Sequence, residues 1–250
     1  MAPLDALALA AEPVDDTAVD AAALNARYGR DDAGSVIALA VNELFPGRIA
    51  LVSSFGAESA VLLHLLSAVD RSVPIIFLDT GRLFAETLEY RARLTRHLGL
   101  TDVRTVAPDP VRLAANDPRR ALWMTNPDLC CHIRKTEPLR RALGGFDAWF
   151  TGRKRFQSSV RADLPVFEAD GERIKVNPLA AWSSDDLVAH AARHDLPEHP
   201  LVARGYQSIG CVPCTTRVEA GEDVRAGRWR GLDKSECGIH TGYETDGSGI

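Results

Sequence analysis

The sequence predicts an α/β fold in which a mostly parallel central sheet is flanked by helices. Three observations predict it: short apolar runs of strand length, helical stretches between these runs, and polar turns that directly follow them. Strands that alternate with helices along a chain are typical of a parallel sheet. With 250 residues, 46% of them hydrophobic, the chain is long enough to bury a full core as one globular domain.

The amino-terminal region is expected to be helical. Ala-rich and Leu-spaced stretches run over residues 17–28, ended by Gly29, and over residues 33–45, ended by Pro46 and Gly47. We therefore divide the chain into a helical segment, 1–45, packed on the core, an α/β region, 46–230, and a flexible tail, 231–250.

The α/β region is expected to begin with four buried strands, at residues 48–52, 74–78, 102–106 and 147–151. Helices are expected between or before them, at residues 57–69, 83–98 and 133–143. A hairpin is then expected, with strands at 166–168 and 173–176 around a turn at 169–172. A last helix begins after Ser183, whose hydroxyl is suited to cap it.

The charge and hydropathy of the chain exclude several classes of protein. A net charge of −5 argues against a general nucleic-acid binder, although a local basic cluster would suffice for a small anion. The first basic residue is Arg27, so the positively charged start of a signal peptide is missing. No run of about 18 apolar residues indicates a membrane span, and we expect a cytoplasmic protein.

Polar turns follow the first two predicted strands. Because the carboxyl ends of parallel strands meet at one edge of a sheet, both turns are placed to bind a ligand there. Hydroxyls and backbone N–H groups at a helix start suit an anion, although a Ser/Gly turn is also an ordinary connection. The candidate contacts in these turns are Ser53, Ser54, Gly56, Glu58, Ser59, Leu78 and Thr80.

The five cysteines divide into four and one. Cys130 and Cys131 are adjacent, Cys211 and Cys214 form a C-x-x-C pair, and Cys237 stands alone. Four thiolates can bind one zinc ion or an iron–sulfur cluster. Adjacent cysteines are unusual for zinc, and a vicinal disulfide would be unusual in a reducing compartment. The spacing alone leaves these alternatives open.

Longer motifs around these residues resemble known families. Residues 53–59 resemble the modified phosphate-binding loop of the adenine-nucleotide α-hydrolase-like superfamily, with Glu58 where its ATP-cleaving members have Asp, and residues 78–84 resemble its L-D-T-G-x-x-F segment. Residues 130–139 resemble the C-C-x-x-R-K-x-x-P-L segment of cluster-bearing bacterial adenylyl-sulfate reductases, within the phosphoadenylyl-sulfate reductase family. Residues 210–215 resemble their G-C-x-x-C-T segment, and residues 234–240 their E-C-G-L-H motif, with Ile in place of Leu.

The resemblance runs from about residue 49 to residue 240 and implies an α-hydrolase-like fold and a [4Fe–4S] cluster. It implies that the cluster is held by Cys130, Cys131, Cys211 and Cys214. Family members specific for 3′-phosphoadenylyl sulfate generally lack these cysteines, so their presence points to adenosine 5′-phosphosulfate as the substrate. Some relatives accept both compounds, which leaves the phosphorylated substrate or dual specificity as the alternative.

Cys237 is expected to be the nucleophile. A cluster has no use for a fifth thiolate, and Cys237 lies in a Gly-rich segment near the end of the chain. The resemblance implies that Cys237 attacks the sulfate sulfur, forms an enzyme S-sulfocysteine and releases AMP. Thioredoxin or a similar dithiol protein then releases sulfite, in sulfate assimilation and cysteine biosynthesis.

A substrate with phosphate and sulfate groups needs fixed cations. Residues 152–161 resemble the family's G-x-R-R-x-Q-S-x-x-R stretch, with Lys154 in place of the first paired arginine, and residues 225–229 its R-x-G-R-W element. The resemblance implies that Gly152, Arg161, Arg225 and Arg228 contact the phosphosulfate and that Lys135 links substrate and cluster.

Two other classes of protein compete with this interpretation. An ATP-dependent thiolation enzyme of the same superfamily would use four cysteines to hold structural zinc, but it has no clear use for the motif around Cys237. An iron–sulfur regulator that binds a nucleotide would not need Cys237 either. We expect no nucleic-acid or membrane partner; a homo-oligomer is compatible with the sequence.

Overall fold

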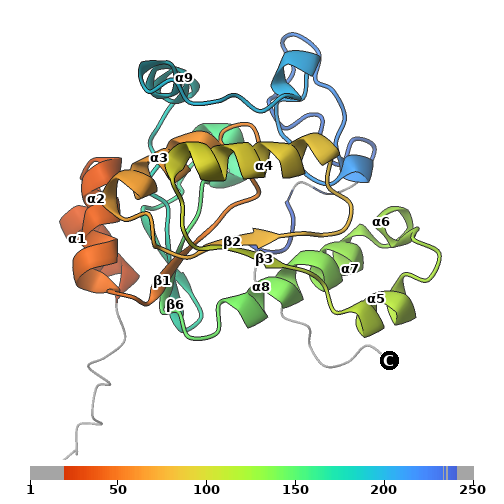
Figure 1. Ribbon diagram of the computed structural model, residues 1–250, viewed down its shortest axis with the longest axis horizontal. Coiled ribbons are helices and arrows are strands. Elements are labelled where there is room, and N and C mark those ends of the chain that lie inside the picture. Colours follow the sequence, from red (N-terminus) through yellow and green to blue (C-terminus); the bar gives the residue numbers. More distant parts are fainter. Residues whose placement is uncertain (1–19, 233, 235, 241–250) are drawn as a thin grey trace, which may run out of the picture.

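The computed structural model describes residues 20–232, 234 and 236–240 (Figure 1). Its central sheet has six strands: β1 Ile49–Val52, β2 Ile75–Leu78, β3 Val103–Val106, β4 Ala148–Phe150, β5 Phe167–Asp170 and β6 Arg173–Val176. They lie in the order β3-β2-β1-β4-β6-β5, and all neighbours are parallel except the antiparallel pair β5 and β6. The mostly parallel α/β sheet and the hairpin predicted from the sequence are therefore confirmed.

Helices surround this sheet. The α-helices are α1 Ala21–Tyr28, α2 Ala33–Leu39, α3 Ser59–Val69, α4 Ala85–Leu98, α5 Pro110–Asn116, α6 Leu122–Thr125, α7 Pro127–Cys131, α8 Glu137–Ala142 and α9 Ser184–Arg193. Two π-helical turns, η1 Ala40–Leu44 and η2 His132–Thr136, continue α2 and α7. Short 3₁₀ turns are η3 Arg155–Gln157, η4 Ser159–Arg161, η5 Val202–Arg204 and η6 Val212–Cys214.

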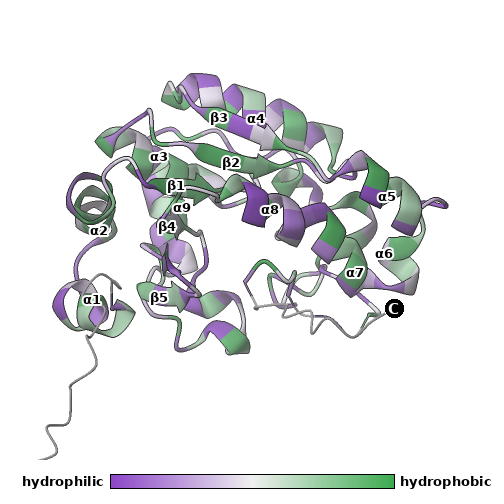
Figure 2. Ribbon diagram, turned by 90° about the horizontal axis from the view of Figure 1, so that it is seen from below, coloured by the Kyte–Doolittle hydropathy of each residue, from purple (hydrophilic) through white to green (hydrophobic). Residues whose placement is uncertain are grey.

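The two faces of the sheet pack against different helices. Side chains alternate across a strand, so Leu51 belongs to the larger apolar core with α3 and α4, whereas Ala50 packs with Leu139 of α8 in a second core. Figures 1 and 2 show α3 and α4 on one side of the strands and α8 on the other. The nearly continuous apolar strands are thus covered on both faces, as a parallel sheet requires.

Helix ends follow the local sequence. At the start of α9, the Ser183 hydroxyl accepts a hydrogen bond from the Asp186 N–H at 3.1 Å, and the Asp186 carboxylate accepts one from the Ser183 N–H at 2.8 Å. This reciprocal pair is a capping box, so the predicted cap is confirmed. Helix α4 ends at Gly99, whose φ of +65° is the left-handed conformation that glycine adopts easily.

The helix predicted at 133–143 starts earlier than expected. Asn126 caps α7 by accepting a hydrogen bond from the Leu129 N–H at 3.0 Å, and Pro127 occupies the first turn. The helical path then passes through the π-helical turn η2 before it continues as α8. Cys130 and Cys131 are consequently the last two residues of α7.

The amino-terminal helices pack on the α/β core. Leu24 of α1 and Ile37 of α2 are buried in the larger core. The boundaries proposed at residues 45 and 230 remain predictions. The part of the first predicted helix before residue 20, and the tail beyond residue 240, lie outside the described residues. Within the described part of the chain, no helix is long and apolar enough to cross a membrane.

Candidate active site

A cavity of about 240 Å³ lies at the carboxyl ends of β1, β2 and β4. From β1 the chain adds β2 and β3 on one side, whereas β4 and β6 lie on the other side. This reversal of strand order is a topological switch point, where α/β sheets bind their ligands because the loops diverge.

Every residue that the sequence assigned to substrate binding lines this one cavity. The set comprises Ser53, Ser54, Gly56, Glu58, Ser59, Leu78, Thr80, Lys135, Gly152, Arg161, Arg225 and Arg228. Cys237 and Cys211 also line the cavity. Residues that are far apart in the sequence therefore meet around one space, although their contacts with a substrate remain predictions.

The turn after β1 is held by a buried aromatic side chain. Phe55 is fully buried and packs edge-on against Phe77, with ring centroids 5.6 Å apart. Its φ of +48° is unusual for a residue with a side chain, and its N–H donates a hydrogen bond to the Ser53 hydroxyl at 3.1 Å. Backbone strain of this kind persists where packing imposes it, often at binding sites.

Glu58 is paired with positive and polar groups. It forms an ion pair with Lys154, and the Gln157 side-chain amide donates a hydrogen bond to the same carboxylate oxygen at 2.7 Å. Burial lowers the pKa of Lys154, and the Glu58 carboxylate opposes that effect. The pairing explains how an acidic residue can stand in a pocket for an anion: its charge is already neutralised.

Two of the predicted anion-binding arginines converge on the tail. The Arg161 guanidinium donates to both carboxylate oxygens of Glu236, at 2.9 and 2.8 Å, and Arg225 donates to one of them at 3.2 Å. The first contact is a bidentate pair, which fixes direction as well as distance. The two arginines thus form a binding place for an oxyanion, which in this structure is the side chain of Glu236.

Arg228 is positioned by the close packing of its own segment. Its guanidinium carbon lies 4.4 Å from the centroid of the Trp229 ring, and its Nε donates to the Cys214 carbonyl at 3.2 Å. A Cβ at Gly227 would lie 2.3 Å from the Thr216 carbonyl oxygen, so only glycine fits there. The third arginine is therefore linked to the cysteine region through the backbone.

The paired cysteines lie together beside the main cavity. Cys130, Cys131, Cys211 and Cys214 are all buried and carry no disulfide. The same four residues line a second, smaller cavity. Burial raises the pKa of Cys130 to about 11, and the neighbouring cysteines add to this rise.

Lys135 lines both cavities and so lies between the four cysteines and the candidate substrate space. It belongs to η2, the π-helical turn that follows Cys131; such turns are frequent at functional sites. Burial would lower the pKa of Lys135, but the charges of Cys211, Cys237 and Cys131 outweigh burial and raise it. Burial alone would raise the pKa of Cys211. The positive charge of Lys135 and other neighbouring groups outweighs burial, so the pKa of Cys211 is lowered.

Cys237 is the only cysteine of the described chain that is not buried. It is half-buried and packs at the edge of a cluster formed by Trp229, Cys211 and Cys214. Three residues further on, the His240 ring stacks on Trp149 with centroids 5.8 Å apart. Burial holds the pKa of His240 well below its usual value, so its ring is neutral. The segment that carries Cys237 is therefore docked on both sides.

Sequence reasoning missed part of the support for this site. Arg134 is buried and donates to the Thr80 carbonyl and to the Asp117 carboxylate, both at 2.7 Å. Asp117 also accepts the Leu122 N–H at 2.9 Å. The R-K pair after the cysteines was the available signal for Arg134, but nothing in the sequence pointed to Asp117.

The fold and the cavity define an α/β protein with a cavity of hydroxyl and basic side chains at a topological switch point, beside a group of thiols. The sequence matches the phosphoadenosine phosphosulfate reductase domain over residues 48–217, and the chain belongs to that family. A protein named adenosine 5′-phosphosulfate reductase from Chelativorans sp. (strain BNC1) is 54% identical over 226 residues, which cover 90% of this chain and 92% of the relative. One of the same name from Streptomyces coelicolor is 40% identical, covering 79% and 84%.

Solved structures agree with this assignment. A phosphoadenylyl-sulfate reductase from Candida auris, in a phosphate complex, has a TM-score of 0.68 and 29% identity, and the match covers 78% of this chain and 96% of that one. Candida glabrata FMN adenylyltransferase has a TM-score of 0.52 at 15% identity over 82% and 74%, a likeness that concerns the fold alone. The predicted α-hydrolase-like fold is confirmed.

Proposed function

We propose that this chain reduces adenosine 5′-phosphosulfate to sulfite and AMP in sulfate assimilation and cysteine biosynthesis. The observation that carries the proposal is the single cavity that Cys237 shares with all twelve predicted substrate contacts. Relatives that cover most of the chain carry the name of this enzyme. We further propose a reducing compartment, the cytoplasm, because all five cysteines are free thiols.

In the proposed reaction the Cys237 thiolate attacks the sulfur of the phosphosulfate group. An S–S bond forms, the bond between that sulfur and the bridging oxygen breaks, and AMP leaves with the electron pair. The products of this step are AMP and an S-sulfocysteine at Cys237. Arg161 and Arg225, which form the oxyanion place beside Cys237, would hold the transferred sulfate and the phosphate in line for attack.

A dithiol protein completes the cycle. One of its thiolates attacks the sulfur of Cys237, sulfite leaves with the electron pair, and a mixed disulfide forms. The second thiol of the reductant then frees Cys237 and leaves the reductant as a disulfide. We propose thioredoxin or a similar protein for this role, because Cys237 is the only non-buried cysteine of the described chain and another protein's thiol must reach it.

The four buried cysteines fit a [4Fe–4S] cluster. Four thiols from two segments face one small cavity, which is the donor set that such a cluster takes. Adjacent cysteines such as Cys130 and Cys131 rarely direct both sulfurs to one zinc ion, which favours the cluster over zinc.

Bound there, the cluster would supply a fixed local charge and order the two cysteine segments. Lys135 lines both the main cavity and the smaller cysteine cavity. Its ammonium group lies between the cluster position and the substrate space, so it can transmit the charge of the cluster to the substrate. Turnover needs no electron from the cluster, because thiol exchange accounts for both electrons.

The experiment that tests this function is an anaerobic assay of the purified protein with thioredoxin. Sulfite is measured from adenosine 5′-phosphosulfate and, separately, from its 3′-phosphorylated form. We expect faster release from the first compound. Faster release from the second would overturn the substrate assignment, and no sulfite from either, in a protein that retains its cluster absorbance, would overturn the reductase.

A separate assay with ATP addresses the superfamily alternative. An ATP-dependent thiolation enzyme would convert ATP to AMP and pyrophosphate. We expect no pyrophosphate release, because Glu58 stands where ATP-cleaving members have Asp and is held by Lys154.

A further inference from the structure

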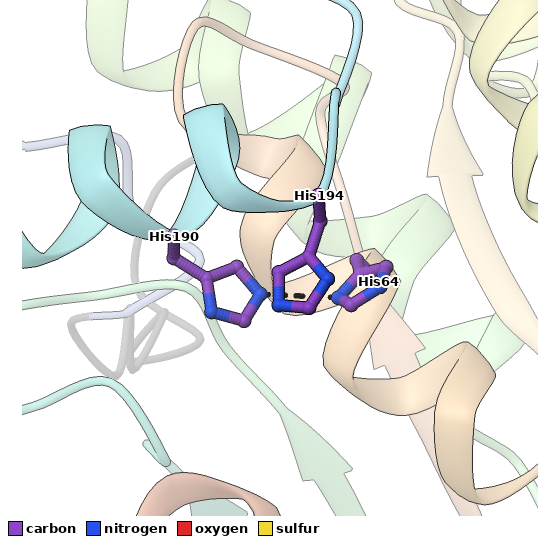
Figure 3. A group of neighbouring side chains, drawn as sticks. All are labelled: His64, His190 and His194. Atoms are coloured by element: carbon purple, nitrogen blue, oxygen red, sulfur yellow. Dashed lines mark hydrogen bonds between the residues drawn. The ribbon is translucent and has the colours of Figure 1, made fainter.

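Three histidines outside the candidate active site come together between two helices. His64 lies on α3, and His190 and His194 lie at the end of α9 (Figure 3). One ring nitrogen from each lies within 4.8 Å of the others. None of the three lines the cavity that holds Cys237.

The arrangement follows from helix geometry and from packing. His190 and His194 are four residues apart, so both rings project from the same face of α9. Helix α3 packs against that face and supplies the third ring. His64 is two residues from Leu62, which lines the active-site cavity, and two residues correspond to roughly 200° around a helix. The cluster therefore lies on the opposite side of α3 from the substrate space.

The rings face one another closely. His64 Nδ1 and His190 Nε2 are 3.0 Å apart, and the His194 ring centroid lies 4.4 Å from that of His64 and 4.5 Å from that of His190. Trp182 packs edge-on against His190 at 5.4 Å and closes one side. His194 is exposed, so the other side is open to solvent.

We propose that His64, His190 and His194 form a binding site for a late first-row divalent metal ion of the zinc type. Three imidazoles with a solvent-facing fourth position are a donor set that such ions take. With a Zn–N bond of about 2.0–2.1 Å, tetrahedral ligands are roughly 3.3 Å apart. The pair of His64 and His190 is already near that spacing, and a ring rotation of His194 would complete it.

The surroundings select the kind of ion. Arg193 of α9 and His97 of α4 act on the rings from outside the cluster, and the first is a permanent cation. The three donor atoms that converge are ring nitrogens. A hard cation such as Mg²⁺ or Ca²⁺, which needs oxygen ligands, is thus disfavoured. Coordination by nitrogen lone pairs has to hold the ion.

In the metal-free protein one of His64 Nδ1 and His190 Nε2 carries the proton of the hydrogen bond that joins them. A metal ion would bind the rings in their neutral form, with that proton moved to the other nitrogen of its ring. A bound ion would cross-link α9 to α3 and so stabilise the folded chain, because it binds the native arrangement alone.

The test uses tag-free protein with its cluster intact, titrated with Zn²⁺ after dialysis into metal-free buffer. Variants His64→Gln and His194→Gln remove one ligand each, and His97→Gln removes an exposed histidine that is not in the cluster. We expect one more bound zinc per chain in the wild type and His97→Gln than in the two ligand variants, or at least a tenfold loss of affinity in them.

Thermal unfolding provides a second readout. The midpoint is expected to rise on zinc addition in the wild type and in His97→Gln but not in His64→Gln or His194→Gln. Equal zinc stoichiometry and affinity in the wild type and in both ligand variants would overturn the proposal. Sulfite release is not part of this test, so its result is independent of the proposed reductase function.

Discussion

The five cysteines of this chain occupy two different environments. Cys130, Cys131, Cys211 and Cys214 are buried, whereas Cys237 is half-buried in a docked carboxyl-terminal segment that lines the substrate cavity. Lys135 acts on the buried group and on Cys237 alike. Buried thiolates suit a ligand role, because they are screened from reagents, while a nucleophile needs access. The difference in burial therefore supports a ligand role for the four buried cysteines and a nucleophile role for Cys237, independently of the sequence motifs.

Replacing Cys237 tests whether the half-buried cysteine is the nucleophile. We expect Cys237→Ser to lower the rate of sulfite release by more than about a thousandfold, because the nucleophile is lost. The visible absorbance of the cluster should remain as in the wild type. Steady-state assays and an absorbance spectrum of the same sample provide the check, and residual turnover within tenfold of wild type would contradict it.

Replacing a buried cysteine tests whether the four buried cysteines are cluster ligands. Cys214→Ser should lose most of the visible absorbance and iron content, and unfold at a lower temperature, because a ligand that helps to hold the fold is missing. Iron analysis and thermal unfolding measure this, with Cys237→Ser as the matched cysteine control. An unchanged iron content would show that Cys214 is not a ligand.

The arginines that contact Glu236 offer a smaller effect. Arg161→Lys keeps the charge but loses the forked donors that now hold Glu236. We expect KM for adenosine 5′-phosphosulfate to rise roughly tenfold, the equivalent of about 1.5 kcal/mol for one hydrogen bond to a charged group. Arg204→Lys, at an exposed pair with Glu86, is the control and should leave KM unchanged. Equal KM values in both variants would argue against a role in binding.

The smallest effect concerns how the tail is held. Glu236→Gln weakens the contacts with Arg161 and Arg225 and should make Cys237 more accessible in the absence of substrate. We expect its alkylation by iodoacetamide to be roughly fivefold faster, which corresponds to about 1 kcal/mol of docking free energy. Glu222→Gln, at a surface pair with Arg230, is the control. A wild-type alkylation rate in Glu236→Gln would mean that this carboxylate does not hold the tail.

Much of the fold was predictable, because local patterns determine it. Apolar runs of strand length predicted β1 to β4 to within one residue at every end, and Ser183 marked the start of α9 through its capping chemistry. Helices α5 and α6 were missed. They have seven and four residues, too short to show a periodicity. The start of the helix predicted at residue 133 was wrong, because the helical path begins at the Asn126 cap of α7.

The site was predictable where motifs carried it and not where tertiary packing did. The motifs indicated the residues that now line one cavity. The pairing of Glu58 with Lys154, of Glu236 with two arginines, and of Asp117 with Arg134 joins residues 96, 75, 11 and 17 positions apart. Such contacts depend on how loops meet at the sheet edge. For the same reason the grouping of His64 with His190 and His194 was not foreseen.

The central claim is that Cys237 takes the sulfonate group from the substrate. Its most direct test is intact-protein mass spectrometry after mixing the anaerobic enzyme with adenosine 5′-phosphosulfate, with no reductant present. We expect a mass increase of one SO₃ group, located on Cys237, with one AMP released per chain, and no such adduct in Cys237→Ser. An adduct on another residue, or sulfite formation without any adduct, would contradict it.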